Sequence, residues 1–298
     1  MTIARRAGQG WRLEAPAPVP DPLRLVADLA RAAEAAGGAA VLGLDFPIGL
    51  PLGFVRAAGL REGGFLSFLE RACDGAFLTP AAALDEVSAA RPFFPAGPLA
   101  GRGLKADFLA RLGLDAETAL RLCDRRGETV RASCGVFWTL GADQVGKAAI
   151  AGWRDLLLPA RRNGLPVAVW PFEGDLAALA HPGRVVLAEA YPAEAYARIG
   201  LARPTRKRDP TWRAAQAEAI LAFAAEHRVS LTPEAATAVR GGFGPSADGE
   251  DAFDSCLGAL GMIPVAEGRH PEGPALPADV RAWEGWMLGR MDVPKSKG

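Results

Sequence analysis

The segment Ala40-Val-Leu-Gly-Leu-Asp-Phe-Pro-Ile-Gly-Leu-Pro51 decides the predicted fold of this chain. Residues 40–44 are an apolar run without polar alternation, which is typical of a strand buried on both faces of a sheet. The run ends at Asp45, and Pro47 prevents the strand from continuing. Because ligands of open α/β sheets lie beyond the carboxyl ends of the strands, Asp45 is a candidate metal ligand or general base. An Asp at this place can equally cap the following turn, and this stretch alone does not separate the two interpretations.

A second segment repeats this pattern. Residues 185–188 (Val-Val-Leu-Ala) are apolar, Glu189 ends the run, and Tyr191-Pro192 breaks the strand and begins a helix. If the two strands are parallel neighbours, Asp45 and Glu189 lie along the same edge of the sheet. Acids at strand ends also serve as caps, so the pairing alone does not establish a site.

Composition sets broad bounds on the class of protein. The 298 residues are half apolar, which predicts a globular α/β protein with a sizeable core. Lys plus Arg equals Asp plus Glu at 34 each, so any basic site must be local. The four cysteines are scattered without zinc-ligand spacing, which favours reduced thiols and a cytoplasmic protein. No apolar segment approaches 18 residues and no signal segment is present, so neither membrane insertion nor secretion is expected.

The remaining chain is predicted to be mostly helical, with further strands at 166–170 and near the N-terminus. Asp21 and Pro22 begin a helix that ends at Gly37-Gly38. Residues 53–161 are expected to form a large, mainly helical insertion between two strands of one sheet. The predicted helices are 65–73, 80–90, 104–112, 115–125 and 143–158 within the insertion, then 210–227 and a terminal helix near 279–291.

Two polar clusters in the last third of the chain are candidates for chemistry. Arg206, Lys207 and Arg208 form the densest basic run, which is either a solvated loop or a group that contacts phosphate. Asp251 and Asp254 are three residues apart, so on a helix they share one face. Acids in a first helical turn also complement the helix dipole, which is the alternative explanation for this pair.

Together, Asp45, Glu189, Asp251 and Asp254 suggest a carboxylate cluster. Mg²⁺ and Mn²⁺ prefer hard oxygen ligands, and two-metal phosphoryl chemistry needs several converging carboxylates. The four acids are therefore predicted to be both catalytic residues and metal ligands. Arg206, Lys207 and Arg208 are predicted to bind the substrate, which would be a nucleic acid.

Three segments carry a resemblance to a known family: Leu44-Asp-Phe-Pro-Ile-Gly-Leu-Pro51, Glu189-Ala-Tyr-Pro192 and Asp251-Ala-Phe-Asp-Ser255. They resemble the family called domain of unknown function 429, whose members are predicted ribonuclease-H-like nucleases. Residues 136–172 also resemble one branch of it, through Gln144-Val-Gly-Lys147 and Trp170-Pro-Phe172. The resemblance covers roughly residues 9–291.

The resemblance implies one ribonuclease-H-like domain over residues 1–298, a mixed sheet flanked by helices. Residues 53–161 would be its helical insertion, and residues 264–298 a C-terminal extension with a terminal helix. It implies that Asp45, Glu189, Asp251 and Asp254 occupy the acidic site, with Lys207 close by. Such nucleases carry their first catalytic acid on the opening strand, whereas Glu14 is the only acid among residues 1–20. The chain is expected to begin inside a hairpin, with that first strand outside it.

Three functions are therefore carried forward. The first is a divalent-metal-dependent nuclease or phosphodiesterase. The second is a non-catalytic binding protein that keeps the ribonuclease-H-like fold, which the missing first acid favours. The third is nucleotide binding at 141–148, which is one residue short of a phosphate-binding loop because Ala148 stands where Ser or Thr would hold Mg²⁺.

Overall fold

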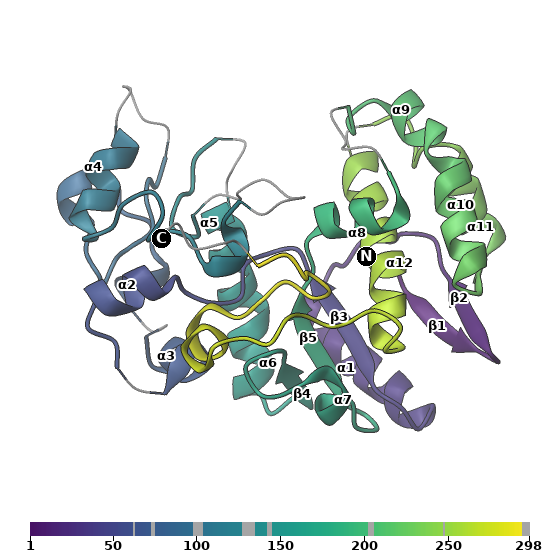
Figure 1. Cartoon of the computed structure of the whole chain (residues 1–298), viewed down its shortest axis with the longest axis horizontal. Coiled ribbons are helices and arrows are strands. Elements are labelled where there is room, and N and C mark those ends of the chain that lie inside the picture. The colour runs from purple at the N-terminus through teal and green to yellow at the C-terminus, as the bar shows by residue number, and fades with distance from the viewer. Residues whose placement is uncertain are drawn as a thin grey trace. The chain divides into compact units, whose positions relative to one another are not determined.

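The structure is a computed structural model that describes residues 1–61, 63–72, 75–97, 104–126, 135–141, 145–201, 206–246 and 248–293. The chain divides into two compact units, each described by itself below (Figure 1). Unit 1 comprises Met1–Asp21 and Ala190–Glu272, and unit 2 comprises Pro22–Glu189 and Gly273–Gly298. Both units combine helices with a small sheet, so the chain is a mixed α/β protein, as predicted.

Unit 2 is built on a parallel sheet with the strand order β3-β5-β4. The strands are β3 (Ala40–Leu44), β5 (Val185–Glu189) and β4 (Val167–Val169), where the apolar runs predict them. Every residue of β5 is buried, as expected for a central strand without polar alternation. The register pairs Leu44 with Glu189, so β3 and β5 end side by side.

The helices of unit 2 cover this sheet and enclose an aromatic core. They are α1 (Pro22–Ala35), α2 (Leu52–Ala57), α3 (Gly64–Ala72), α4 (Leu104–Arg111), α5 (Val145–Gly152), the π-helical η4 (Trp153–Leu157), α6 (Leu158–Arg162) and α7 (Leu176–Leu179). Phe93 packs edge-on against Phe137 and Trp153, with ring centroids 5.3 and 5.9 Å apart. Burial of such rings supplies much of the apolar stabilisation of this unit.

Three predicted helices of unit 2 are wrong. Residues 80–90 contain only the 3₁₀ turn η2 (Leu84–Glu86), and residues 115–125 contain only η3 (Leu122–Asp124). Near Asp115 the carboxylate accepts the backbone N–H groups of Glu117 and Thr118, a local bond that competes with helix formation. The terminal helix is reduced to the π-helical η5 (Val280–Glu284).

Gly285 explains where η5 ends. Its φ is +66°, a left-handed conformation that other residues rarely adopt. A Cβ at this position would lie 2.6 Å from the carbonyl oxygen of Ile48, so the two backbones touch. The C-terminal segment is thereby packed directly on the stretch that follows Asp45.

Unit 1 contains a second sheet with the order β1-β2-β6. β1 (Ala4–Ala7) and β2 (Gly10–Leu13) form an antiparallel hairpin, and β6 (Val229–Leu231), which was not predicted, runs parallel to β2. The helices are α8 (Pro192–Ile199), α9 (Pro210–Ala215), α10 (Ala217–Glu226), α11 (Pro233–Arg240) and α12 (Gly249–Ala266). The predicted helix 210–227 is therefore interrupted, at Gln216. Across the residues placed in both units, no helix has the length and apolar character needed to cross a membrane.

Glu267 joins the hairpin of unit 1 to the end of α12. Its carboxylate accepts hydrogen bonds from the indole of Trp11 at 2.9 Å, from Arg6 and from Arg269. Burial opposes ionisation of this carboxyl, but the three donors outweigh it and lower the pKa of Glu267 to about 2. The ionised form therefore stabilises the fold.

Glu267→Gln is expected to lower the free energy of unfolding of the chain at pH 7 by about 1–2 kcal/mol, after allowance for solvent screening. The folded-state pKa is depressed, so this contribution is present above about pH 4.5 and is lost as the pH falls toward 2. Urea unfolding of both proteins between pH 7 and pH 2.5 measures the difference, with exposed Glu218→Gln as the control. A difference that does not shrink with falling pH contradicts the assignment.

Candidate functional site

Asp45 lies at the carboxyl end of β3 in unit 2, next to the end of β5. Its neighbour Leu44 pairs with Glu189, so the two predicted acids belong to one edge of the parallel sheet (Figure 1). Asp45 is exposed, whereas Glu189 is 4% exposed. The backbone N–H of Ile48 donates to Glu189 Oε2 at 2.8 Å and ties the loop after Asp45 to the end of β5.

Glu189 is held by a buried arginine that the sequence did not reveal. Arg121 Nη1 and Nη2 donate to the two oxygens of Glu189 at 2.6 and 2.7 Å. Arg121 Nε and Nη2 also donate to Asp124 at 2.8 and 2.9 Å. The guanidinium is fully buried and makes two hydrogen bonds to each carboxylate, a bidentate geometry that only the planar arginine side chain provides.

Glu284 completes this network through backbone groups. Its carboxylate accepts the N–H of Leu52 at 2.8 Å and the N–H of Leu122 at 2.6 Å. Arg121 Nη1 also donates to the carbonyl oxygens of Ile48 and Glu284, each at 3.2 Å. Burial raises the pKa values of Glu189 and Glu284, and the Arg121 charge opposes that shift in both. A metal ion on Glu189 would have to displace Arg121.

Unit 1 holds a second cluster around Lys207. Its ammonium Nζ lies 2.7 Å from Glu250 Oε1 and 2.9 Å from Asp254 Oδ2. Glu250 and Asp254 are one turn apart on α12, at the i, i+4 spacing that places two side chains on one face. Tyr196, on α8, donates its hydroxyl to the other oxygen of Asp254. Two carboxylates thus converge on one cation.

The charges of this cluster stabilise one another. Burial opposes the charge on Lys207, but its hydrogen bonds to Glu250 and Asp254 outweigh this and raise its pKa. Burial raises the pKa of Asp254, and the hydrogen bonds from Tyr196 and Lys207 only partly offset this rise. The pKa of Glu250 is lowered because its bond to Lys207 outweighs its burial. The ammonium therefore stays charged well above neutral pH.

The other predicted residues of unit 1 are next to members of this cluster in the sequence, and only Arg208 has a recorded contact with it. Asp251 is exposed in the first turn of α12 and interacts electrostatically with the amino group of Met1. Arg208 Nε lies 3.4 Å from Glu250, and the Arg208 side chain is 87% exposed. Arg206 is exposed. Residues 202–205, which precede this basic run, lie outside the described residues.

Arg213 shapes the backbone that carries Lys207. Its guanidinium is fully buried and donates to the carbonyl oxygens of Lys207 at 2.6 Å, Gly242 at 2.7 Å and Gly244 at 2.7 Å. A Cβ at Gly249 would lie 2.4 Å from Arg213 Nη2, so only glycine fits beside it. The hydrogen bonds of Arg213 thus link the backbone at Lys207 to the 242–249 loop.

Among the residues with described positions, no three His, Cys, Asp or Glu side chains are grouped closely enough to hold a metal ion. The pair Glu250 and Asp254 meets at a single cation, and Asp45 is an exposed carboxylate in unit 2.

The segment 141–148 has features that do not suit a phosphate-binding loop. The Gly146 N–H, which would be needed to bind phosphate, donates to the carbonyl of Trp138 at 2.9 Å. A Cβ at Gly146 would lie 2.7 Å from that oxygen, so this glycine is explained by packing. Lys147 is exposed on α5, and residues 142–144 lie outside the described part of the chain.

Sequence reasoning missed five polar residues of these clusters: Arg121, Asp124, Glu284, Tyr196 and Glu250. Glu250 had a readable signal, since its i, i+4 spacing to Asp254 places the two together on a helix at least as well as the i, i+3 spacing of Asp251. Arg121 and Asp124 had none, because the segment 115–125 was predicted only as a helix and carried no candidate site residue. Only the folded chain brings them to Glu189.

No curated protein and no solved structure matches the chain significantly. A family profile with the description "Protein of unknown function (DUF429)" matches residues 1–279. That match spans nearly the entire sequence, and the chain belongs to the DUF429 family.

Proposed function

We propose that this protein is a divalent-metal-dependent phosphodiesterase of the nuclease type. The observation that carries the proposal is the convergence of Glu250 and Asp254 on one cation, the Lys207 ammonium, at 2.7 and 2.9 Å. A position that already attracts a cation between two carboxylates is suited to Mg²⁺ or Mn²⁺. The resemblance to predicted ribonuclease-H-like nucleases, and the parallel sheet ending at Asp45 and Glu189, support the same reaction class.

Each residue of the cluster then has a task. Glu250 and Asp254 would hold the metal, and the Tyr196 hydroxyl orients Asp254 through its hydrogen bond. A bound metal lowers the pKa of its water and neutralises phosphate oxygens. Lys207 is 35% exposed on a flexible stem, so it can leave the carboxylates and contact a substrate phosphate. Arg206 and Arg208 are exposed in the same segment and would contact neighbouring phosphates.

Asp45, Glu189 and Asp251 remain predicted members of the acidic site. Asp45, at the carboxyl end of β3, and Asp251, in the first turn of α12, are exposed, whereas Glu189 is buried. Glu189 would serve as a ligand only after release from Arg121, so in the present arrangement it positions the loop that follows Asp45. The ribonuclease-H-like fold and the cytoplasmic location belong to this proposal, which rests on the family resemblance and the scattered cysteines.

The second candidate is a non-catalytic binding protein. It is favoured by one observation: both oxygens of Asp254 and both oxygens of Glu189 already accept hydrogen bonds within the chain. Carboxylates held in this way can act as purely structural groups. Nucleic acid bound without cleavage, with or without metal, would support this candidate over the enzyme.

Asp254→Asn and Asp45→Asn are each expected to reduce metal-dependent cleavage at least ~100-fold, because each removes a charged oxygen ligand. The assay titrates Mg²⁺ and Mn²⁺ with labelled DNA, RNA and branched substrates. Glu218→Gln in unit 1 and Asp107→Asn in unit 2 are matched controls, since both acids are exposed on helices. Cleavage that persists in Asp254→Asn and Asp45→Asn, or that is absent with every metal and substrate, rejects the proposal.

A second measurement follows metal binding without activity. Lys207→Met removes the competing cation and leaves Glu250 and Asp254 facing each other. Mn²⁺ is therefore expected to raise the Tm of Lys207→Met more than that of the unaltered protein. The double variant Lys207→Met, Asp254→Asn should lose this response. If Mn²⁺ shifts none of the three Tm values, the carboxylate pair is not a metal site.

A further inference from the structure

The basic run of unit 1, Arg206 to Arg208, is bound to carboxylates of its own chain. Lys207 Nζ lies 2.7 Å from Glu250 Oε1 and 2.9 Å from Asp254 Oδ2. Arg208 Nε lies 3.4 Å from the second oxygen of Glu250. Two of the three side chains that are predicted to contact a substrate are therefore engaged by two acids of α12.

These two acids, Glu250 and Asp254, occupy the place that phosphate groups of a nucleic acid would take beside the run. Arginine and lysine bind carboxylate and phosphate oxygens through the same N–H donors. An ammonium has three donors, and two of those of Lys207 are already used by the two carboxylates. A polyanion and the acids of α12 therefore require the same donors.

The ion pairs of the run are open to solvent, whereas its backbone is fixed. The side chain of Lys207 is 35% exposed and that of Arg208 is 87% exposed, so both can change partners. The buried guanidinium of Arg213 holds the carbonyl oxygen of Lys207 at 2.6 Å. The cations can therefore leave the acids of α12 without unfolding the segment that carries them.

We propose that Glu250 and Asp254 mask Lys207 and Arg208, so that a nucleic-acid backbone has to compete with these acids for the basic run. The charges of the two cations and the two carboxylates sum to zero, which weakens the attraction of a polyanion to this site. The inference rests on the nucleic-acid substrate of the proposed function, but it needs neither a metal nor cleavage. It applies equally to an enzyme and to a non-catalytic binding protein.

The test is fluorescence anisotropy of a short, labelled single-stranded DNA with the full chain in EDTA, at several salt concentrations. Glu250→Gln and Asp254→Asn are each expected to lower the Kd about fivefold, because one carboxylate fewer then holds Lys207. The slope of log Kd against log salt concentration should become steeper by about 0.7, since one more cation is available to phosphate. Lys207→Met should weaken binding and make the effect of Glu250→Gln smaller, because the two residues interact directly.

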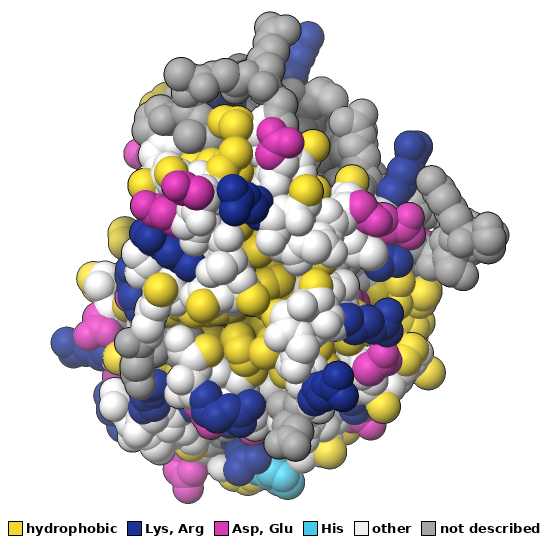
Figure 2. Space-filling view, turned by 90° about the vertical axis from the view of Figure 1, so that its left-hand side faces the viewer, with side chains coloured by type: hydrophobic (Ala, Val, Ile, Leu, Met, Phe, Trp, Pro, Cys, Tyr) yellow, Lys and Arg dark blue, Asp and Glu magenta, His cyan; other side chains and the backbone are white. Residues whose placement is uncertain are grey.

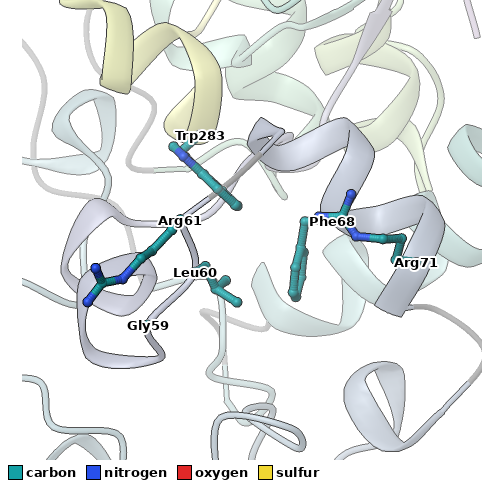
Figure 3. A pocket seen from close by; sticks show the side chains of 6 residues that line it. All are labelled: Gly59, Leu60, Arg61, Phe68, Arg71 and Trp283. Carbon is teal, nitrogen blue, oxygen red and sulfur yellow. The ribbon is translucent and has the colours of Figure 1, made fainter.

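Two control variants separate masking from the general effect of a changed charge. Asp248→Asn removes an exposed acid at the start of α12 that makes no ion pair with Lys207 or Arg208 in the described part of the chain. Arg61→Gln removes an exposed arginine of unit 2, which extends outward beside a pocket of about 290 Å³ in Figure 3. Figure 2 shows other Lys and Arg side chains scattered over that side of unit 2. Each control should change the Kd less than about twofold.

The direction of the change in Kd decides between masking and a purely structural role. If Glu250 and Asp254 only anchor the run, their variants weaken DNA binding or leave the Kd unchanged, and the proposal is overturned. Equal tightening by Asp248→Asn, or no DNA binding by any variant, overturns it as well. Because metal is absent, failure of this test leaves the proposed hydrolysis open. Absence of cleavage with Mg²⁺ or Mn²⁺ would likewise leave a tighter complex of Glu250→Gln with DNA unexplained by anything but masking.

Discussion

Arg121→Met is expected to lower the free energy of unfolding of the chain by about 3–5 kcal/mol, the largest loss of stability that the structure predicts. The substitution keeps most of the side-chain volume but removes the four guanidinium hydrogen bonds to Asp124 and Glu189. Both carboxylates would then be buried without their cation, at 3% and 4% exposure. The loop after Asp45 would also lose the bond from Arg121 to the Ile48 carbonyl.

The pH dependence distinguishes this loss from a simple packing defect. Burial already raises the pKa of Glu189 in the folded protein, and removal of the Arg121 charge takes away the main opposing effect. When the pKa of a carboxyl group is higher in the folded than in the unfolded protein, its protonated form stabilises the fold. For Glu189 this contribution is complete below the unfolded pKa of about 4.5, and it is lost as the pH rises through the folded pKa. The difference in free energy of unfolding between Arg121→Met and the unaltered protein should therefore be larger at pH 8 than at pH 5.

Urea unfolding followed by tryptophan fluorescence measures the effect, and amide exchange identifies the segments that open. Exposed Arg111→Met is the control for loss of a surface arginine. In the double variant Arg121→Met, Glu189→Gln the loss should be smaller than the sum of the two single losses, because the residues interact directly. A difference below about 1 kcal/mol between Arg121→Met and the control at pH 8 would show that the network does not hold the fold.

The sheet of unit 2 was readable from the sequence because its strands are buried on both faces. Apolar runs without alternation occur at residues 40–44 and 185–188, and no competing helical period is present there. β6 was missed because three residues between two helices carry too little pattern to register. The predicted helix 115–125 was wrong because Asp115 bonds to its own local backbone and Arg121 turns inward to the nearby Asp124 and the distant Glu189. The hydrophobic periodicity of a segment carries no information about hydrogen bonds to residues far away in the sequence.

The candidate site was only partly predictable for the same reason. Strand-end position picked out Asp45 and Glu189, and their strands proved to be parallel neighbours. The position at a strand end could not show that Asp45 is exposed whereas Glu189 is hydrogen-bonded to the buried Arg121, because Arg121 is 68 positions from Glu189 in the sequence. In unit 1, spacing on α12 and the basic run picked out Asp254 and Lys207, which are in contact at 2.9 Å; their role in a functional site stays a prediction. Whether Asp251 takes part in the same chemistry stays a prediction.

Arg213→Met is expected to lower the free energy of unfolding by about 3 kcal/mol and to loosen the Lys207 segment at the same time. Arg213 is fully buried, and its described partners are all carbonyl oxygens, on Lys207, Gly242, Gly244 and Ser246. Removal of its donors would leave these acceptors without their partner, which is more destabilising than loss of the bonds alone. Because Arg213 Nη1 holds the Lys207 carbonyl at 2.6 Å, Lys207 should also lose its fixed position between Glu250 and Asp254.

Urea unfolding gives the loss of stability, and amide exchange over residues 206–216 and 240–249 shows whether both segments open together. Exposed Arg240→Met, at the end of α11, is the matched control. Arg213→Lys should recover only part of the stability, since one ammonium cannot reach carbonyls on opposite sides of the planar guanidinium. If Arg213→Met stays within about 0.5 kcal/mol of the control, the bonds to these carbonyls are not what holds the loop. If stability falls but the 206–216 segment keeps its protection, Lys207 is positioned by Glu250 and Asp254 alone, and Arg213 serves only the 240–249 loop.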